Sequence, residues 1–270
     1  MLKYLVKHTG LSDKLLKSPD FIIAGAQKSG TTYLYNLLVQ HKDILPSTTK
    51  EVHYFDNNIN KGDEWYLSHF PFKFFNTNKI TGESSPYYLY HPLAAERIYN
   101  FDNQIKIILL LRNPVDRAIS HLNMIINRHD IDFNFEDFCN IENEIIIQKL
   151  LTEKLKRETI TKSNIHQDFS FIQRGIYAPQ VKKYMNYFKL HKNLLIIKSE
   201  DFFDNNKKTL DTIFDFLGVS VYKAKINLAV NNFSGEYNNN FIQCRKLLIK
   251  YYKHHNKELE DLLGLKMNWD

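Results

Sequence analysis

The sequence predicts a three-layer, P-loop-like α/β fold in which a central parallel sheet is flanked by helices. Three observations predict it. Short apolar runs recur along the 270 residues, and such runs are typical of parallel strands buried on both faces. Segments with apolar residues at helical spacing separate these runs, which is the alternation of an α/β fold. The first run leads into a glycine-bearing turn and a helix, an arrangement typical of phosphate-binding folds.

The first half of the chain supplies two expected strands. FIIAGA, residues Phe21–Ala26, is the first strand, and TTYLYNLLVQH, residues Thr31–His41, follows it as a helix. KIILLL, residues Lys106–Leu111, is the second strand and is apolar almost throughout. The next letters are RNP, in which Asn113 can cap a helix that begins at Pro114.

The second half continues the alternation. NLLIIK, residues Asn193–Lys198, is a third strand, and an amphipathic helix over Tyr177–Leu190 precedes it. TLDTIFDFLGV, residues Thr209–Val219, is expected to be a helix closed by Gly218. A last helix is expected over Phe241–Leu263.

We expect one domain over residues 1–270, with a mostly helical insert at about residues 131–173. The 36 Lys and Arg residues exceed the 30 Asp and Glu residues by six, and this balance favours an anionic partner. No signature of a nucleic-acid-binding protein is present, so we expect no nucleic-acid partner. No apolar run has the length of a signal peptide or of the ~20 residues of a membrane span, which predicts a cytoplasmic protein without an integral membrane segment. The oligomeric state stays open.

The two cysteines carry little information about function. Cys139 and Cys244 lack the spacing of a zinc site, and two cysteines do not make a disulfide framework. We expect two buried thiols, and a single disulfide is left open.

The strongest motif is AGAQKSGTT, residues Ala24–Thr32. A strand, a glycine-bearing loop and a helix place several backbone N–H groups around one point, and the helix dipole adds positive charge there. Gly25 and Gly30 have the spacing of the Walker A pattern, but Thr31 stands where that pattern has its Lys. The cation is instead Lys28, two residues before Gly30. The loop is therefore expected to bind a phosphate other than that of a Walker-type ATP kinase.

Here the sequence resembles a known family, the sulfotransferases that use 3′-phosphoadenosine 5′-phosphosulfate (PAPS). QKSGTT is similar to their 5′-phosphosulfate loop, and LRNPVDRAIS, residues Leu111–Ser120, is similar to their 3′-phosphate motif. KEVHYFD, residues Lys50–Asp56, resembles a segment of the heparan sulfate 3-O-sulfotransferases, and WYLSHFPF and GESSPYYL follow in the family's order. RGIYAPQVKKYMNYF, residues Arg174–Phe188, resembles a segment of bacterial members. The resemblance extends over about residues 20 to 220 and includes the N-sulfotransferases.

The resemblance implies PAPS as donor, 3′-phosphoadenosine 5′-phosphate (PAP) as product, and no metal. The residues expected to bind the nucleotide are Gln27, Lys28, Ser29, Gly30, Thr31, Thr32, Arg112, Ser120, Arg174 and Tyr177. A physical reason also supports Arg112 as a nucleotide-binding residue, because it follows a buried strand at the edge where open α/β sheets bind ligands. Its planar fork suits a phosphate, and Ser120 lies about two helical turns further on.

On the acceptor side, the resemblance implies that Glu51 is the general base, since a carboxylate oriented towards a hydroxyl can take its proton. His53, two residues on, lies on the same side of an extended segment and is the rival for this role. Lys28 is expected to stabilise the sulfonate and the leaving phosphate during catalysis. Asp56 is a weaker candidate for a contact in this loop, and Lys50 for a helping cation. The acceptor is expected to be a hydroxyl of a glycan, a lipid or a small metabolite.

The sequence departs from the family in two places. Ser84 follows Glu83 where the animal heparan sulfate enzymes have a Lys, which weakens the expectation of a heparan-like acceptor. Residues Asn231–Phe241 contain no Lys or Arg, whereas relatives have a basic loop there that closes on the 3′-phosphate. Arg174 is a candidate to replace the basic residues of that loop. Tyr177 is expected either to contact the nucleotide or to pack in the interior.

Two other functions are alternatives to sulfuryl transfer. The first is a P-loop nucleotide kinase, against which the missing Lys at Thr31 argues. The second is a non-enzymatic basic module that binds polyanions.

Overall fold

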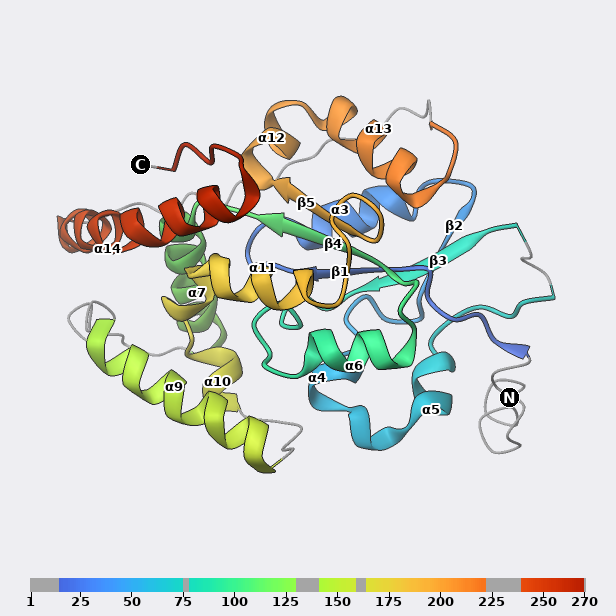
Figure 1. Cartoon of the computed structure of the whole chain (residues 1–270), viewed down its shortest axis with the longest axis horizontal. Coiled ribbons are helices and arrows are strands. Elements are labelled where there is room, and N and C mark those ends of the chain that lie inside the picture. The colour runs from blue at the N-terminus through green and yellow to red at the C-terminus, as the bar shows by residue number, and fades with distance from the viewer. Residues whose placement is uncertain (1–14, 75–77, 130–140, 159–163, 222–238, 270) are drawn as a thin grey trace.

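The computed structural model describes residues 15–74, 78–129, 141–158, 164–221 and 239–269. In these residues a single sheet of parallel strands has the order β2-β3-β1-β4-β5 (Figure 1). The strands are β1 Phe21–Gly25, β2 Ile44–Pro46, β3 Ile80–Ser84, β4 Lys106–Leu111 and β5 Leu194–Lys198. The predicted three-layer α/β fold is therefore confirmed.

Helices cover both faces of the sheet. The α-helices are α3 Thr31–Leu38, α4 Tyr54–Asn57, α5 Asp63–Leu67, α6 Ala94–Phe101, α7 Pro114–His129, α9 Ile141–Glu158, α10 Asn164–Asp168, α11 Tyr177–Met185, α12 Ser199–Asp204, α13 Asn206–Leu217 and α14 Asn239–Leu263. Two short 3₁₀ helices are η1 Ile59–Lys61 and η2 Gln173–Gly175.

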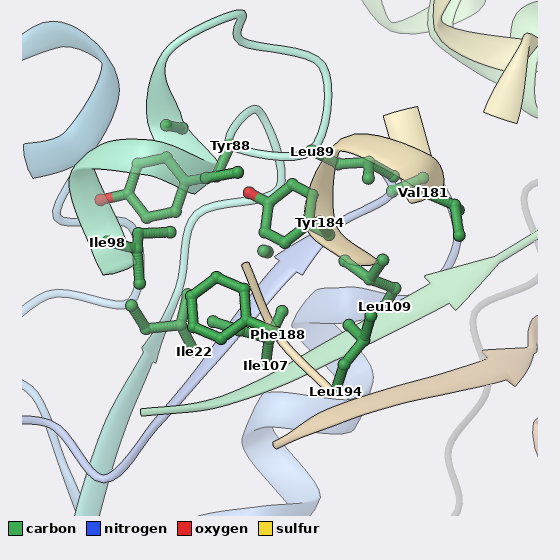
Figure 2. Close-up of a cluster of buried hydrophobic side chains, with 14 of the residues drawn as sticks. Ile22, Tyr88, Leu89, Ile98, Ile107, Leu109, Val181, Tyr184, Phe188 and Leu194 are labelled. Carbon is green, nitrogen blue, oxygen red and sulfur yellow. The ribbon is translucent and has the colours of Figure 1, made fainter. Parts of the chain in front are cut away.

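The apolar runs are buried on both faces because alternate side chains of each strand point to opposite layers. Phe21 and Ile23 of β1 pack with side chains of α3, α12 and α13. Ile22 and Ala24 pack with side chains of α6 and α11 on the other face. Figure 2 shows this second layer, where Ile22, Ile107, Leu109 and Leu194 lie with Ile98, Val181, Tyr184 and Phe188.

The predicted elements agree with the structure to within a few residues at their ends. Lys106–Leu111 is β4 with the expected bounds, and α7 begins at Pro114. Asn113 Oδ1 accepts from the backbone N–H of Val115 at 2.9 Å, which is the predicted cap. Gly218 closes α13 in the left-handed conformation, as expected, with φ 78°.

Two strands were not predicted. β2 has only three residues, and β3 reads ITGES, which is not an apolar run. Thr81, Glu83 and Ser84 are nevertheless fully buried. The side chains of Thr81 and Glu83 have hydrogen-bond partners in other segments, Leu45 O for Thr81 and the Tyr66 hydroxyl for Glu83, and a single sequence does not reveal such partners.

The region expected to be an insert contains α9, α10 and η2 in its described part. A third apolar cluster joins α7 to α14 and to Phe171 and Ile172, and Cys244 of α14 is buried in it. Cys139 lies outside the described residues.

Candidate active site

The phosphate loop joins β1 to α3 at the carboxyl edge of the sheet. Ala26 N–H donates to Leu110 O at 2.8 Å, which ties the start of the loop to β4. Gly25 has no room for a side chain, because a Cβ there would lie 2.5 Å from Leu89 Cβ. Gly30 caps α3 with φ 92°, in the region that favours glycine. The order of strands reverses beside β1, and this is where open α/β sheets bind their ligands.

Arg112 follows β4 and lies directly against this loop. Its Nη1 donates to Lys28 O at 3.1 Å, so the two predicted nucleotide-binding motifs meet. Ser199 Oγ donates to Ser29 O at 2.7 Å and supports the loop from α12. Lys28 has φ 68°, a strained conformation for a residue other than glycine, and such residues are concentrated at functional sites.

The positive charges around the loop are not neutralised by carboxylates in the part of the chain that the structure describes. No ion pair there includes Lys28, Arg112 or Arg174. The pKa of Lys28 is lowered by burial first and then by the positive charges of Arg112, Arg128, Arg117 and Lys50. Cations held together in this way favour a bound anion, because an anion relieves both the repulsion and the burial of charge.

Arg174 lies at the other end of the loop and is almost fully buried. Its Nη1 donates to Gln27 Oε1, its Nε to Ser170 Oγ at 2.6 Å, and its Nη2 to Gln167 O. The guanidinium also stacks 4.7 Å from the Tyr87 ring centroid. Three nitrogens of Arg174 thus bind protein groups and position Gln27, so contact with a nucleotide stays a prediction.

The remaining nucleotide candidates are placed on supporting elements. Tyr177 is buried and its hydroxyl donates to Arg112 O at 2.9 Å, so it holds the residue that carries the predicted phosphate fork. Ser120 lies on α7, partly buried. Thr31 is buried at the start of α3, whereas Thr32 is exposed. Of the segment Asn231–Phe241, residues 231–238 lie outside the described residues.

The acceptor segment, residues Lys50–Asp56, runs alongside the phosphate loop. His53 is its centre, with φ 54°. Its Nδ1 lies 2.7 Å from Asp56 Oδ2, and its Nε2 lies 3.1 Å from Glu51 Oε2. Asp56 is fully buried, whereas the side chain of Glu51 is 37% exposed. Glu51, His53 and Asp56 therefore form a hydrogen-bonded triad with Glu51 at its open end.

The pKa values of the two candidate bases are shifted in opposite directions within this triad. Burial lowers the pKa of His53, but hydrogen bonds to Asp56 and Glu51 outweigh it and raise the pKa to about 10. At neutral pH the ring is therefore protonated, and both nitrogens donate. Burial raises the pKa of Glu51, but hydrogen bonds from His53 and Lys50 lower it to about 2. Glu51 is therefore the ionised acceptor of the pair, and the choice between Glu51 and His53 as general base stays a prediction.

Lys50 connects the two halves of the site. Its Nζ donates to Thr32 Oγ1 at 2.6 Å and forms an ion pair with Glu51 Oε1. Lys50 and Asp56 were only weak candidates from the sequence, because the partners of a loop Lys or Asp are not visible in a sequence. The signal that could have found them is the spacing of Lys50, Glu51, His53 and Asp56 within one short segment.

The fold and this geometry define a class of protein, and comparisons with known proteins agree. The family model for the sulfotransferase domain matches residues 18–259. The chain belongs to the sulfotransferase domain family, which confirms the resemblance inferred from the motifs.

Individual relatives are distant in sequence. The membrane-associated sulfotransferase kil1 of Dictyostelium discoideum is 26% identical, over 95% of this chain and 67% of its own length. Heparan sulfate glucosamine 3-O-sulfotransferase 5 of Mus musculus is 27% identical, over 84% of this chain and 61% of its own length. A crystal structure of a sulfotransferase from Alicyclobacillus acidocaldarius matches with a TM-score of 0.73 and 25% identity, covering 94% of this chain and 99% of that one.

The structure also bears on membrane-spanning helices and on metal ligands. None of the described helices is long and apolar enough to cross a membrane. Among the same residues, no group of three or more His, Cys, Asp or Glu side chains could hold a metal ion. The cytoplasmic location and the metal-free reaction stay predictions.

Proposed function

We propose that this protein transfers the sulfuryl group of PAPS to an acceptor hydroxyl, with Glu51 as the general base. The observation that carries the proposal is the double contact of Lys50, which joins Thr32 of the phosphate loop to Glu51 of the acceptor segment. A loop that binds the donor phosphate and a carboxylate that activates the acceptor thus lie on either side of one cation. Such positioning and charge stabilisation are what group transfer between oxygens requires of a protein.

The residues around the loop fit a bisphosphate nucleotide. The loop residues from Gln27 to Thr32 supply backbone N–H groups at the start of α3, a helix of eight residues. Lys28 supplies a cation for the 5′-phosphosulfate, and Arg112 supplies a planar fork for the 3′-phosphate. Ser120 adds a hydroxyl on α7. Two separate groups of donors correspond to the two phosphates of PAPS.

The acceptor segment supplies the proton chemistry. Glu51 takes the proton of the acceptor hydroxyl at its carboxylate, while the imidazolium of His53 orients that carboxylate. Lys50 and Lys28 stabilise the negative charge that develops on the sulfonate and the bridging oxygen. The hydrogen bond and charge of Lys50 are among the causes that lower the pKa of Glu51, so a displacement of Lys50 towards that charge would raise this pKa and make Glu51 a stronger base.

The acceptor itself is proposed only as a class. Two of the relatives are named for sulfation of heparan sulfate glucosamine or for membrane association. Ser84 stands where the heparan sulfate enzymes of animals have a Lys, so we propose a hydroxyl of a glycan, a lipid or a small metabolite without restricting it to heparan sulfate.

The proposal is tested by a nucleotide comparison followed by an acceptor screen. PAP is expected to raise the melting temperature of the protein at concentrations at which ATP with Mg²⁺ does not. Transfer of ³⁵S from labelled PAPS to glycan, lipid, phenol or alcohol acceptors is then measured with and without a chelator. Stabilisation by ATP–Mg²⁺ but not by PAP would instead favour the alternative of a P-loop kinase.

A further inference from the structure

Glu83 is a buried carboxylate at the end of β3, next to the acceptor segment but not part of its triad. It is fully buried, and no ion pair in the described part of the chain includes it. Its Oε1 accepts from the hydroxyls of Tyr66 and Tyr88, both at 2.9 Å. Its Oε2 accepts from Ser85 Oγ at 2.5 Å and from the backbone N–H of Val52 at 3.2 Å. Hydrogen bonds therefore stand in for the cation that a buried carboxylate ordinarily requires.

One of these donors, the backbone N–H of Val52, belongs to the acceptor segment itself, and two others, Ser85 and Tyr88, also bind that segment. Ser85 Oγ accepts from the backbone N–H of His53 at 3.1 Å. The Tyr88 hydroxyl accepts from the backbone N–H of Tyr54 at 2.7 Å. The backbone N–H of Ser84 adds a bond to Lys50 O at 2.9 Å. The acceptor segment is thus held along its length by β3 and the turn after it, and Glu83 lies behind two of the contacts.

The donor and acceptor roles in the hydrogen bonds around Glu83 explain why this residue is a carboxylate. A hydroxyl has one proton, and the backbone N–H groups of His53 and Tyr54 can only donate. The oxygens of Ser85 and Tyr88 accept from them, so their own protons point elsewhere, and Glu83 is the acceptor for both. Burial raises the pKa of Glu83, while the hydrogen bonds from Ser85, Tyr88, Tyr66 and Val52 act in the opposite direction by favouring the ionised form. In that form the carboxylate has only acceptor sites and accommodates all of these donors. An amide in its place would turn an NH₂ group towards one of the oxygens and oppose a donor.

The backbone of His53 gives this support a consequence for the site. With φ 54°, His53 has a conformation that costs energy for a residue with a side chain and persists only where neighbours impose it. The bond from its N–H to Ser85 Oγ is such a constraint. Because Glu51 and Asp56 both bind the His53 ring, a change in the backbone conformation at His53 displaces the whole triad.

We propose that Glu83 is a positioning residue for the sulfuryl transfer, which it serves by fixing the backbone at His53 and Tyr54 through the hydroxyls of Ser85 and Tyr88. The inference rests on the proposed function of Glu51 and His53 as the acceptor side. Glu83 itself touches neither donor nor acceptor, since it is enclosed by protein groups.

Two tyrosines provide a matched test. Tyr66 and Tyr88 are both fully buried and both donate to Glu83 Oε1 at 2.9 Å, but only Tyr88 also accepts from the acceptor segment. Tyr88→Phe is expected to lower kcat for ³⁵S transfer by about tenfold to a hundredfold, as a small misplacement of reacting groups does, with the KM for PAPS unchanged. Tyr66→Phe, the same chemical change, is expected to have a much smaller effect on kcat.

An NMR titration of the His53 ring provides a readout that needs no acceptor. The pKa of His53 is raised to about 10 because both carboxylates lie in place. It is expected to fall in Tyr88→Phe and in Ser85→Ala, and to stay near the wild-type value in Tyr66→Phe. Glu83→Gln is expected to lower it as well. Should that variant fail to fold, the Tyr88 and Ser85 variants still decide the matter.

The outcomes separate this inference from the proposed function. An unchanged His53 pKa and kcat in both Tyr88→Phe and Ser85→Ala would overturn the positioning role, even with sulfuryl transfer demonstrated. Equal losses in Tyr66→Phe and Tyr88→Phe would overturn it too, since they would indicate a general packing defect. A His53 pKa that is lower in Tyr88→Phe and Ser85→Ala than in the wild type would still show that this network positions the triad, even if the wild type transfers no sulfuryl group. The absence of transfer would refute the proposed function.

Discussion

The phosphate loop and the acceptor segment lie side by side, joined by Lys50, but they treat charge in opposite ways. Around the loop, Lys28 and Arg112 form no ion pair within the described residues, and burial together with neighbouring cations lowers the pKa of Lys28. In the acceptor segment every cation has a carboxylate: Lys50 pairs with Glu51, and His53 pairs with Glu51 and Asp56. One side carries excess positive charge and the other is balanced.

This difference matches the two substrates of a sulfuryl transfer. A nucleotide with two phosphates supplies the negative charge that the loop lacks, so the loop is expected to bind it. A hydroxyl is neutral and needs a base and an oriented hydrogen bond rather than a charge. Substitutions on the two sides should therefore affect different quantities, with nucleotide affinity on one side and turnover on the other.

The largest effect is expected from Glu51→Gln on turnover. Removal of a general base lowers kcat by about a hundredfold to ten-thousandfold, because the amide cannot take the proton of the acceptor. The affinity for PAP is expected to stay at the wild-type value, since Glu51 belongs to the balanced side. Single-turnover ³⁵S transfer measures the first quantity, and isothermal titration calorimetry the second.

Glu153→Gln is the matched control, because Glu153 is an exposed residue of α9 in a surface pair with Lys156. Full turnover in Glu51→Gln would remove this carboxylate from the mechanism. A loss of PAP affinity as large as the loss of turnover would break the separation of the two sides.

The next largest effect is expected from Lys28→Ala on nucleotide binding. A hydrogen bond to a charged group contributes about 1.5–3 kcal/mol, so the Kd for PAP is expected to rise roughly tenfold to a hundredfold. Calorimetry at two salt concentrations checks this, because attraction of an anion weakens as salt is added. Lys42→Ala, at an exposed position just after α3, serves as the control. Unaltered PAP affinity in Lys28→Ala would show that the unpaired charge of the loop does not serve the nucleotide.

Much of the fold could be predicted because the buried strands consist of runs of apolar residues, which are visible in the sequence. The runs that became β1, β4 and β5 are apolar on both faces, and the caps at Asn113 and Gly218 are local features. β3 could not be predicted in the same way. The buried side chains of Thr81 and Glu83 bind Leu45 O and the Tyr66 hydroxyl, and the backbone N–H of Ser84 binds Lys50 O. These partners are distant or unremarkable in the sequence.

The site divides in a similar manner. Gly25, Lys28 and Gly30 could be recognised, since a loop between a strand and a helix has its function built into adjacent residues. The roles of Glu51 and His53 could not be separated, because the protonation of His53 depends on its place between two carboxylates. Tyr177 is comparable: the choice between packing and ligand contact needed the bond of its hydroxyl to Arg112 O.

The smallest effect is expected from His53→Gln on stability. This variant tests only the charge balance that distinguishes the acceptor segment from the phosphate loop. The folded pKa of His53 is raised from 6.5 to about 10, so its pairing stabilises the fold fully below pH 6.5 and ceases to do so as the pH rises through 10. The folded pKa of Glu51 is lowered from 4.5 to about 2, so its contribution is full above pH 4.5 and is lost as the pH falls through 2. Both contributions are therefore complete between pH 4.5 and 6.5.

Urea unfolding of the wild type and of His53→Gln should differ most within that window. The difference in the free energy of unfolding is expected to be on the order of 1 kcal/mol, because solvent screens the partly exposed Glu51. It should shrink steadily from pH 6.5 towards pH 10, because the unfolded His53 ring is neutral there and folding must take up a proton. His254→Gln, which removes an exposed partner of Glu258 on α14, should show no such trend. A difference that is the same at pH 6 and pH 10 would mean that His53 is neutral in the folded protein, and the acceptor side would then carry an excess negative charge instead of a balance.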